Sequence, residues 1–329
     1  MRTNNYEQAI SLLRESNTIA IFMHINPDPD CVGSALALGV FLRKMGKTVS
    51  VFTPDTKTLN MVASKMLFLP DIDTLNKGQK GAFDLSVAVD LGDTGRIGDW
   101  ALPLFYKGNK KLVIDHHETF EDFADVTVRE TDASSTAQIL YKILLQFDEE
   151  LFDKDIATLL YAGILTDCGN FSYECTSAET FSIASNLMKY NINITEITRK
   201  LTKDINYAVF RLKTKALSET RFFMDKKIAF IVFKQKDFLD TATTEKDTDG
   251  IINEIQNITS VLLAVSIAEV GINSFKVSFR SKGSISAKEC AEKFGGGGHY
   301  NAAGCRIKGK FEDVFEKLLS VSKSQLMYV

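Results

Sequence analysis

Histidines are scarce in this chain of 329 residues, and three of the four stand close to aspartates. His24 begins the spacing His-x-x-x-Asp-x-Asp, which includes Asp28 and Asp30, and residues 115–117 read Asp-His-His. Imidazole nitrogens and carboxylate oxygens, with no thiolate among them, are the ligands that manganese, magnesium, iron and cobalt favour. These blocks therefore predict a divalent metal site.

Two further aspartates extend the set. Asp90 closes the apolar run LSVAVD, and Asp167 lies in GILTDCGNF near the end of an expected helix. One ion needs only three or four protein ligands, so a larger set favours two ions that share a bridging carboxylate. Two divalent ions about 3.5–4 Å apart form the usual clamp for in-line attack on phosphorus. The six candidate ligands are His24, Asp28, Asp30, Asp90, His116 and Asp167.

Each block taken alone has a simpler explanation. Asp-x-Asp in a proline-containing loop is typical of a solvated turn, and an aspartate after a strand often caps a helix. Adjacent histidines can simply fill space. We favour the metal site because several such blocks coincide in one half of a chain with so few histidines.

The elements around these residues alternate between strand and helix. The apolar runs are continuous, as in strands covered on both faces of a sheet, which predicts an α/β fold with a doubly wound, mainly parallel sheet. The two prolines of INPDPD are expected to exclude a helix from that loop. Expected strands are 18–24, 48–52, 85–90 and 111–116, and expected helices are about 6–15, 32–45, 134–147, 155–168 and 177–189.

The ligand blocks follow the expected strands directly. His24 ends the first run, Asp90 ends the third, and Asp115-His116 ends the fourth. In an open parallel sheet, ligands bind outside the carboxyl ends of the strands. The sequence thus predicts that these blocks meet at one edge of the sheet.

The pattern changes in the last third of the chain. We expect a first domain at 1–190, a helical linker at 191–220, which could act as a hinge, and a second, smaller α/β domain at 221–329. This length suits two domains. The second domain has expected strands at 227–233, 260–270 and 274–281 and expected helices at about 249–258, 286–294 and 312–325.

Four consecutive glycines, 295–298, precede His299. Such a run can be a flexible linker, but here it lies between an expected helix and the strand-like AAGCRI, which favours a tight turn. Glycines allow backbone N–H groups to approach a ligand closely. Arg280 ends a nearby strand and suits bidentate phosphate recognition, although many such arginines are simply exposed.

Charge and composition exclude several functions. The net charge is −3, so the chain lacks the basic excess of proteins that grip long duplex nucleic acid, while a short phosphorylated ligand stays possible. Five cysteines without Cys-x-x-Cys spacing predict neither a disulfide framework nor a structural zinc site. The polar N-terminus and the longest apolar stretch, 261–268, predict neither a signal peptide nor a membrane span. We expect a cytoplasmic protein.

The motifs resemble those of a known family. HINPDPD, VDLGD, DHH and ILTDCGNF resemble, in order, the four motifs of the DHH phosphoesterase superfamily. Residues 280–304, with GGGH-x-x-AAG at 296–304, resemble the DHH-associated C-terminal domain. The two-domain layout is most similar to the bifunctional oligoribonuclease and 3′-phosphoadenosine 5′-phosphate (PAP) phosphatase group.

The resemblance implies a role for each motif residue. Asp90 would bridge two ions, normally manganese, with magnesium or cobalt as alternatives. Asp115 would orient its neighbours and His117 would face the substrate phosphate, with Arg280 as a further catalytic group. Cys168 departs from the threonine common in the family, and Cys31 replaces another small residue. The first ion would be held by His24, Asp28 and Asp90, the second by Asp30, Asp90, His116 and Asp167, and the nucleotide by Arg280, Ser281, Gly296, Gly297, Gly298 and His299.

The implied activity is metal-assisted hydrolysis of oligonucleotides of 2–5 nucleotides to mononucleotides, and of PAP to AMP. The alternatives are a dedicated phosphodiesterase for the dinucleotide pApA in cyclic di-AMP turnover, a manganese-dependent pyrophosphatase and a non-catalytic nucleotide- or RNA-binding module. The GGGH signature disfavours the pyrophosphatase, and the complete ligand set disfavours the non-catalytic module. The sequence leaves open the preferred substrate, the polarity of digestion, RNA against DNA, and whether the protein forms a homodimer.

Overall fold

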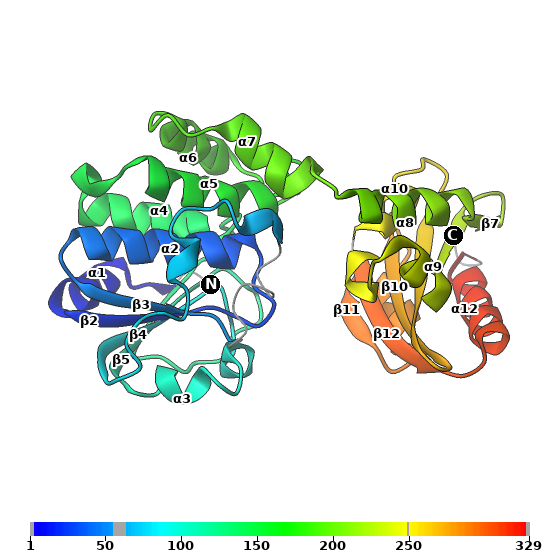
Figure 1. Ribbon diagram of the computed structural model, residues 1–329, viewed down its shortest axis with the longest axis horizontal. Coiled ribbons are helices and arrows are strands. Elements are labelled where there is room, and N and C mark those ends of the chain that lie inside the picture. The colour runs from blue at the N-terminus through cyan, green and yellow to red at the C-terminus, as the bar shows by residue number, and fades with distance from the viewer. Residues whose placement is uncertain (1–2, 55–63, 249, 327–329) are drawn as a thin grey trace. The chain divides into compact units, whose positions relative to one another are not determined.

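The computed structural model describes residues 3–54, 64–248 and 250–326, and the chain divides into two compact units, Met1–Asp204 and Ile205–Val329 (Figure 1). The division falls inside 191–220, so the exact bounds of domains and linker stay a prediction. The first unit ends with α7 (Ile194–Thr198) and a π-helical turn (Arg199–Lys203). Across the described residues, every helix is too short or too polar to cross a bilayer.

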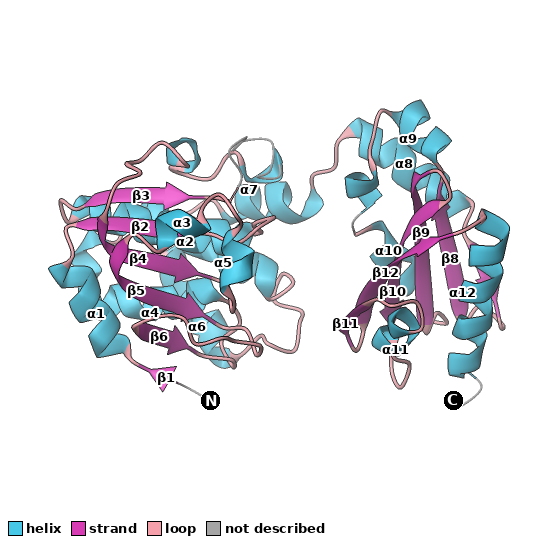
Figure 2. Ribbon diagram, turned by 90° about the horizontal axis from the view of Figure 1, so that it is seen from below, coloured by secondary structure: helices cyan, strands magenta, loops and turns pink. Residues whose placement is uncertain are grey.

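The first unit contains the predicted α/β sheet (Figure 2). Its strand order is β1-β6-β5-β4-β2-β3, in which five strands run parallel and β1 pairs antiparallel at one edge. The short strands β1 and β6 were not predicted. The strands are β1 (Thr3–Asn4), β2 (Thr18–Phe22), β3 (Thr48–Phe52), β4 (Phe83–Val89), β5 (Gly108–Asp115) and β6 (Val126–Arg129).

Both faces of this sheet are buried, which explains the continuous apolar runs. On one face, strand residues such as Ile21 pack against helices in a large core cluster. On the other face, residues such as Phe22 pack against the segment containing a 3₁₀ turn (Thr94–Ile97) and α3 (Leu102–Phe105). The helices are α1 (Tyr6–Glu15), α2 (Pro29–Lys44), α4 (Thr136–Phe147), α5 (Lys154–Asp167) and α6 (Ala178–Met188).

Helix α2 begins at Pro29, earlier than predicted, so the expectation that the prolines exclude a helix there is wrong. Proline is well suited to the first helical position, where its missing N–H has no helical partner to lose. The Asp28 carboxylate caps the helix by accepting from the Cys31 amide at 3.0 Å. As a result Asp30 lies in the first turn of α2, at a fixed position.

Helices α2 and α5 pack closely because two glycines face the contact. A Cβ atom on Gly33 would lie 2.4 Å from the carbonyl oxygen of Leu159 in α5. A Cβ atom on Gly163 would lie 2.6 Å from Oδ1 of Asp30 in α2. The absence of side chains at these two positions lets Asp30 lie directly against α5.

The second unit is the predicted smaller α/β domain, with a mixed sheet in the order β11-β12-β10-β9-β8-β7. Among its described strands, β8 and β9 pair in parallel and the other neighbours pair antiparallel. Helices α11 and α12 cover one face, and α8, α9 and α10 contribute to the core on the other. The strands are β7 (Arg221–Phe223), β8 (Ile228–Phe233), β9 (Leu263–Gly271), β10 (Ser274–Ser281), β11 (Gly297–His299) and β12 (Ala302–Lys308), and the helices are α8 (Tyr207–Ser218), α9 (Gln235–Thr241), α10 (Ile251–Gln256), α11 (Ala287–Glu292) and α12 (Phe311–Leu326).

Candidate metal centre

The predicted ligand blocks meet at the carboxyl edge of the first sheet. His24 follows β2, Asp90 follows β4, and His116 follows β5, and these three strands are adjacent in the order β5-β4-β2. Parallel pairing brings their carboxyl ends to the same edge. The central strand therefore places Asp90 between the two histidines.

Asp90 is the shared member of this group. Its Oδ2 lies 3.5 Å from His24 Nε2, and its Oδ1 lies 3.6 Å from His116 Nε2. Only 2% of the residue is exposed, and its φ of 61° is unusual for a residue other than glycine. Burial alone would raise the Asp90 pKa, but the contact with His24 and the neighbouring imidazoles lower it below its ordinary value. The two neighbouring imidazoles therefore favour the ionised form of the Asp90 carboxylate.

Asp30 and Asp167 reach the same place from helices α2 and α5. Asp167 Oδ2 lies 3.2 Å from His116 Nε2. Asp30 is 1% exposed and accepts hydrogen bonds from the amides of Thr136 at 2.8 Å and Ala137 at 2.9 Å. Burial, together with the charges of Asp90 and Asp167, raises the Asp30 pKa well above its ordinary value. Burial likewise raises the pKa of Asp167 to about 7.

The histidine rings are oriented by backbone carbonyls. His24 Nδ1 lies 2.8 Å from the carbonyl oxygen of Ile25, and His116 Nδ1 lies 3.4 Å from that of Ala133. Donation from Nδ1 leaves the lone pair on Nε2, which is the atom that faces Asp90 in both residues. A carbonyl behind the ring is the usual support of a metal-binding imidazole.

The donor set fits divalent metal. Two ligand atoms each about 2.1 Å from one ion are roughly 3–3.4 Å apart, close to the His–Asp separations of 3.2–3.6 Å. Buried carboxylates so close together repel one another unless a cation offsets their charge. Two groups of three possible ligands contain Asp90. Another group, made of Asp30, His116 and Asp167, has its ligand atoms equally close together.

The His117 ring has a different hydrogen-bond partner from the His116 ring. Its Nδ1 donates to Asp115 Oδ1 at 2.7 Å, while Asp115 is fully buried with its other carboxylate oxygen unpartnered within the described residues. This hydrogen bond raises the His117 pKa above its ordinary value, although burial and the charge of Arg96 oppose it. Arg129 holds the loop by donating from Nε to the His117 carbonyl at 2.8 Å. His117 is thus anchored at Nδ1 and has Nε2 available.

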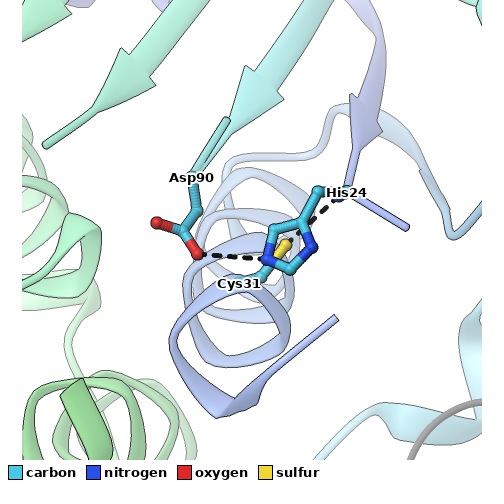
Figure 3. A group of neighbouring side chains, drawn as sticks. All are labelled: His24, Cys31 and Asp90. Carbon is cyan, nitrogen blue, oxygen red and sulfur yellow. Dashed lines mark hydrogen bonds and ion pairs between the residues drawn. The ribbon is translucent and has the colours of Figure 1, made fainter. Parts of the chain in front are cut away.

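Cys31 occupies the position beside His24 and Asp90 where Asp28 was expected (Figure 3). The Cys31 sulfur accepts from the His24 amide at 3.4 Å and lies 3.8 Å from the carbonyl oxygen of Val89. Burial and nearby carboxylates raise its pKa well above the ordinary value, so the thiol stays protonated and is a poor ligand. Asp28 is exposed at the start of α2, and no group of three ligand atoms includes it among the described residues.

In the second unit, Arg280 and His299 lie in one row of the sheet. Arg280 pairs with Ala302 across β10 and β12, and His299 pairs with the same Ala302 across β11 and β12. Directly paired residues place their side chains on the same face, so Arg280 and His299 flank a small alanine. Ser281 belongs to the opposite, buried face, where its hydroxyl accepts from the Ala287 amide at 3.2 Å.

The glycine run is a turn and an edge strand within the second unit. Gly295 has a φ of 72°, and Gly298 has a φ of 144°. A Cβ atom on Gly298 would lie 2.6 Å from the carbonyl oxygen of Ala302, and one on Gly296 would lie 2.2 Å from that of Gly304. The glycines therefore let β11 pair closely with β12.

Comparison with known proteins gives the family. The profile of the DHH family, N-terminal domain, matches residues 18–164, and that of the DHHA1 domain matches residues 225–327. The bifunctional oligoribonuclease and PAP phosphatase NrnA of Mycoplasma pneumoniae is 30% identical over 94% of this chain and 93% of its own. The chain belongs to the DHH family. It is a phosphoesterase with groups that can hold a divalent metal.

Other relatives extend over nearly the whole chain. The probable bifunctional oligoribonuclease and PAP phosphatase NrnA of Streptococcus mutans is 29% identical over 97% of this chain and 99% of its own. The crystal structure of an exopolyphosphatase-related protein from Bacteroides fragilis has a TM-score of 0.87 at 25% identity, covering 98% of this chain and 96% of that one. The likeness to these two proteins thus extends over nearly the whole of this chain and includes both the DHH and the DHHA1 matches.

Three residues that act on the site in the DHH domain, Thr136, Ala137 and Arg96, were not predicted from the sequence. The Thr136 amide and hydroxyl and the Ala137 amide contact the ligand aspartates from the start of α4. Arg96 lies close enough for its charge to act on His117. The N-cap pattern Ser135-Thr136 could have marked the start of α4, but nothing in it points to residues 30 and 90.

Proposed function

We propose that this protein is a two-metal phosphoesterase that cleaves oligonucleotides of 2–5 nucleotides to mononucleotides and converts PAP to AMP. The observation that carries this proposal is the Asp90 carboxylate, which has an imidazole near each of its two oxygens. A carboxylate placed in this way can bridge two ions. Manganese is the ion that we propose, because the donors are oxygens and imidazole nitrogens.

Each proposed ion has its own supporting residues. His24 and Asp28 would complete the first site with Asp90, and Asp30, His116 and Asp167 would complete the second. Asp28 would join through movement of its exposed carboxylate at the start of α2. When bound, such ions polarise the phosphoryl oxygens and lower the pKa of an attacking water.

The protein's own groups would bind and neutralise the phosphate. His117, which we propose as a catalytic residue, can donate from Nε2 to a phosphoryl or leaving oxygen, because Asp115 keeps Nδ1 occupied and raises the pKa. Arg96 lies close enough for its charge to act on His117, and it would add positive charge beside that residue. Such preformed charge stabilises a transition state in which charge builds on oxygen.

We propose that the DHHA1 domain holds a nucleotide on the row formed by Arg280, Ala302 and His299. A planar guanidinium binds a phosphate with two parallel hydrogen bonds, and Arg280 would also serve as a catalytic group. The small Ala302 leaves space between the two larger side chains. Gly296, Gly297 and Gly298 would bring backbone N–H groups to the same ligand. Ser281, on the other face, would act by fixing the end of β10.

A turnover panel tests this proposal. The purified protein, with manganese, is offered RNA di- to pentanucleotides, PAP, the dinucleotide pApA, pyrophosphate and a long duplex. We expect release of mononucleotides from the short RNAs and of phosphate from PAP, with no activity on the duplex. Activity on pApA alone would instead identify a dedicated dinucleotide phosphodiesterase. Activity on pyrophosphate alone, or no activity at all, would contradict the proposal.

A matched pair of variants assigns the activity to this centre. Asp90→Asn keeps the size of the side chain but removes the charge that two ions would share, and we expect turnover to fall at least about a thousandfold. Asp93→Asn is the control, because Asp93 caps the neighbouring 3₁₀ turn by accepting from the Arg96 amide at 3.1 Å. Asparagine caps equally well, so this variant should retain activity.

A further inference from the structure

Three buried side chains of different chemistry meet at the carboxyl end of β2 (Figure 3). His24 lies just after this strand, Asp90 follows the neighbouring strand β4, and Cys31 lies in the first turn of α2. One ligand atom from each residue lies within 4.8 Å of the other two. The exposed fractions are 3% for His24, 2% for Asp90 and zero for Cys31. An imidazole, a carboxylate and a thiol thus converge inside the DHH domain.

The separations suit one tetrahedral ion. Zinc binds nitrogen and oxygen ligands at about 2.0–2.2 Å and thiolate sulfur at about 2.3 Å, so its ligand atoms are roughly 3.3–3.7 Å apart. The distance of 3.5 Å between His24 Nε2 and Asp90 Oδ2 falls in this range. Because the Cys31 sulfur is already within 4.8 Å of both partners, a shift of about 1 Å completes the geometry.

The Cys31 thiol makes only weak contacts that an ion can replace. The His24 amide approaches its sulfur at 3.4 Å, and the Val89 carbonyl oxygen lies 3.8 Å away. A thiol is a weak donor and a weak acceptor, so these contacts cost little to lengthen. The backbone is held more firmly, because the Asp28 carboxylate accepts from the Cys31 amide at 3.0 Å. The start of α2 therefore keeps the sulfur beside His24 and Asp90.

The thiol distinguishes this ligand set from the one that we propose for manganese. Manganese favours oxygen and imidazole ligands, and a protonated thiol contributes little to its binding. Zinc and cadmium favour thiolate, and their coordination removes the thiol proton, which passes to solvent. The charges of Asp28, Asp30 and Asp90 act on this thiol. They oppose an isolated thiolate, but they favour a thiolate that carries a dication.

We propose that His24, Cys31 and Asp90 form a binding site for a thiophilic divalent cation of the zinc class. The site shares His24 and Asp90 with the first manganese position of the proposed function, and Cys31 takes the place of Asp28. An ion bound there excludes manganese from that position, so the ratio of the two metals sets the fraction of active protein. Only this inhibition rests on the proposed function, because binding of the ion requires no turnover.

Cadmium, a spectroscopic probe of thiolate ligands, tests the site directly. Metal-free Cys175→Ser protein, which lacks the exposed thiol, is titrated with cadmium, and the ultraviolet charge-transfer absorption of the cadmium–thiolate bond is recorded. We expect one equivalent of cadmium to produce this band and Cys31→Ala, in the same background, to lose it. A band that persists in Cys31→Ala, or cadmium that binds to the Cys175→Ser protein without a band, would overturn the proposal.

The cadmium-113 NMR shift answers the same question with Cys31 intact. In the Cys175→Ser protein, a sulfur ligand moves the resonance to low field, whereas a site of nitrogen and oxygen ligands alone leaves it at high field. This measurement decides the proposal even if Cys31→Ala fails to fold, which circular dichroism would show.

Two variants at neighbouring positions separate the two ligand sets. Cys31→Ser should weaken zinc binding at least about tenfold, since loss of a ligand costs no less than loss of a residue that supports one, and leave manganese binding unchanged. Asp28→Asn keeps the helix cap and should weaken manganese binding while zinc binding stays the same. Isothermal titration calorimetry on metal-free protein measures both ions. Equal zinc affinity in the wild type and in Cys31→Ser would contradict the proposal.

This proposal and the proposed function fail in different ways. A protein that binds cadmium through Cys31 but hydrolyses none of the panel substrates refutes only the function. A protein that hydrolyses them with manganese, but whose cadmium complex has no thiolate band, refutes only the zinc-class site. If both proposals hold, zinc should inhibit turnover with manganese in the wild type and inhibit it at least about tenfold less strongly in Cys31→Ser.

Discussion

The hydroxyl of Thr136 donates a hydrogen bond to Asp90 Oδ1 across 2.9 Å. Thr136 is fully buried, so removal of this hydroxyl leaves a buried carboxylate oxygen short of a donor. We predict that Thr136→Val weakens manganese binding by about 10- to 100-fold, while Thr136→Ser retains it. Isothermal titration calorimetry on protein freed of metal measures the change.

Thr127→Val is the matched control for this prediction. The Thr127 hydroxyl is buried in β6 and has no hydrogen-bond partner among the described residues. Its removal should leave manganese affinity as in the wild type. Equal losses in Thr136→Val and Thr127→Val would show that the effect comes from general destabilisation.

The stoichiometry of metal binding separates the two proposed sites. We predict two manganese ions per wild-type chain, one after Asp28→Asn, and one after Asp167→Asn, because each of these carboxylates serves a single proposed ion. The Asp90→Asn protein should lose both manganese ions at micromolar manganese concentrations. Inductively coupled plasma mass spectrometry after desalting counts the ions, and a wild-type chain that retains only one would disprove the bridging role of Asp90.

The metal-free protein should lose stability as pH rises. Burial raises the pKa of folded Asp167 to about 7 from 3.8, so its stabilising contribution is complete below pH 4 and disappears as pH approaches 7. We predict that the free energy of unfolding in EDTA falls over this range by up to a few kcal/mol. Urea denaturation at pH 5, 6 and 7 measures the slope.

Asp167→Asn provides the comparison for this pH series. An amide does not titrate, so the variant should lose a large part of the slope and be less sensitive to pH than the wild type. Excess manganese should reverse the wild-type trend, because ions bind the ionised carboxylate. Identical slopes in the two proteins without metal would contradict the assignment to Asp167.

Much of the DHH domain could be predicted because its signals are local. Each of these ligand residues, His24, Asp90 and His116, directly follows an apolar run in the sequence. The same short segment therefore predicts both the strand and the ligand at its end. The contacts of Thr136 with Asp30 and Asp90 could not be predicted in this way. They join residues 106 and 46 positions apart, and they arise only because the start of α4 packs against α2, which carries Asp30, and reaches the end of β4, where Asp90 lies.

Pro29 shows a different limit. Proline is a barrier to helix formation in the interior of a helix but not at its first position, which is where Pro29 lies. The error mattered for the site, because the early start of α2 places Asp30 on the helix. In the second domain, alternating burial along β10 separates Arg280 from Ser281, although both were predicted to bind the same ligand.

Arg280 and His299 supply the last prediction. Arg280→Lys keeps the charge but loses the two parallel hydrogen bonds, and we expect KM for PAP to rise about tenfold or more in both Arg280→Lys and Arg280→Ala. Steady-state kinetics with manganese separate KM from kcat. Arg306→Ala is the control, since Arg306 lies on the same face of β12, four residues from Ala302, and is exposed. An unaltered KM in Arg280→Ala would exclude this row from substrate binding.

The close contact of α2 and α5 at Gly33 and Gly163 has a consequence for how this enzyme can vary. Neither position has a side chain that could bind metal or substrate, yet a single methyl group at either would push against a backbone carbonyl or against Asp30 itself. In a library of all single substitutions selected for activity, both positions should therefore be as intolerant as the ligands. A survey of mutational tolerance would then mark as functional two residues whose contribution is to leave space.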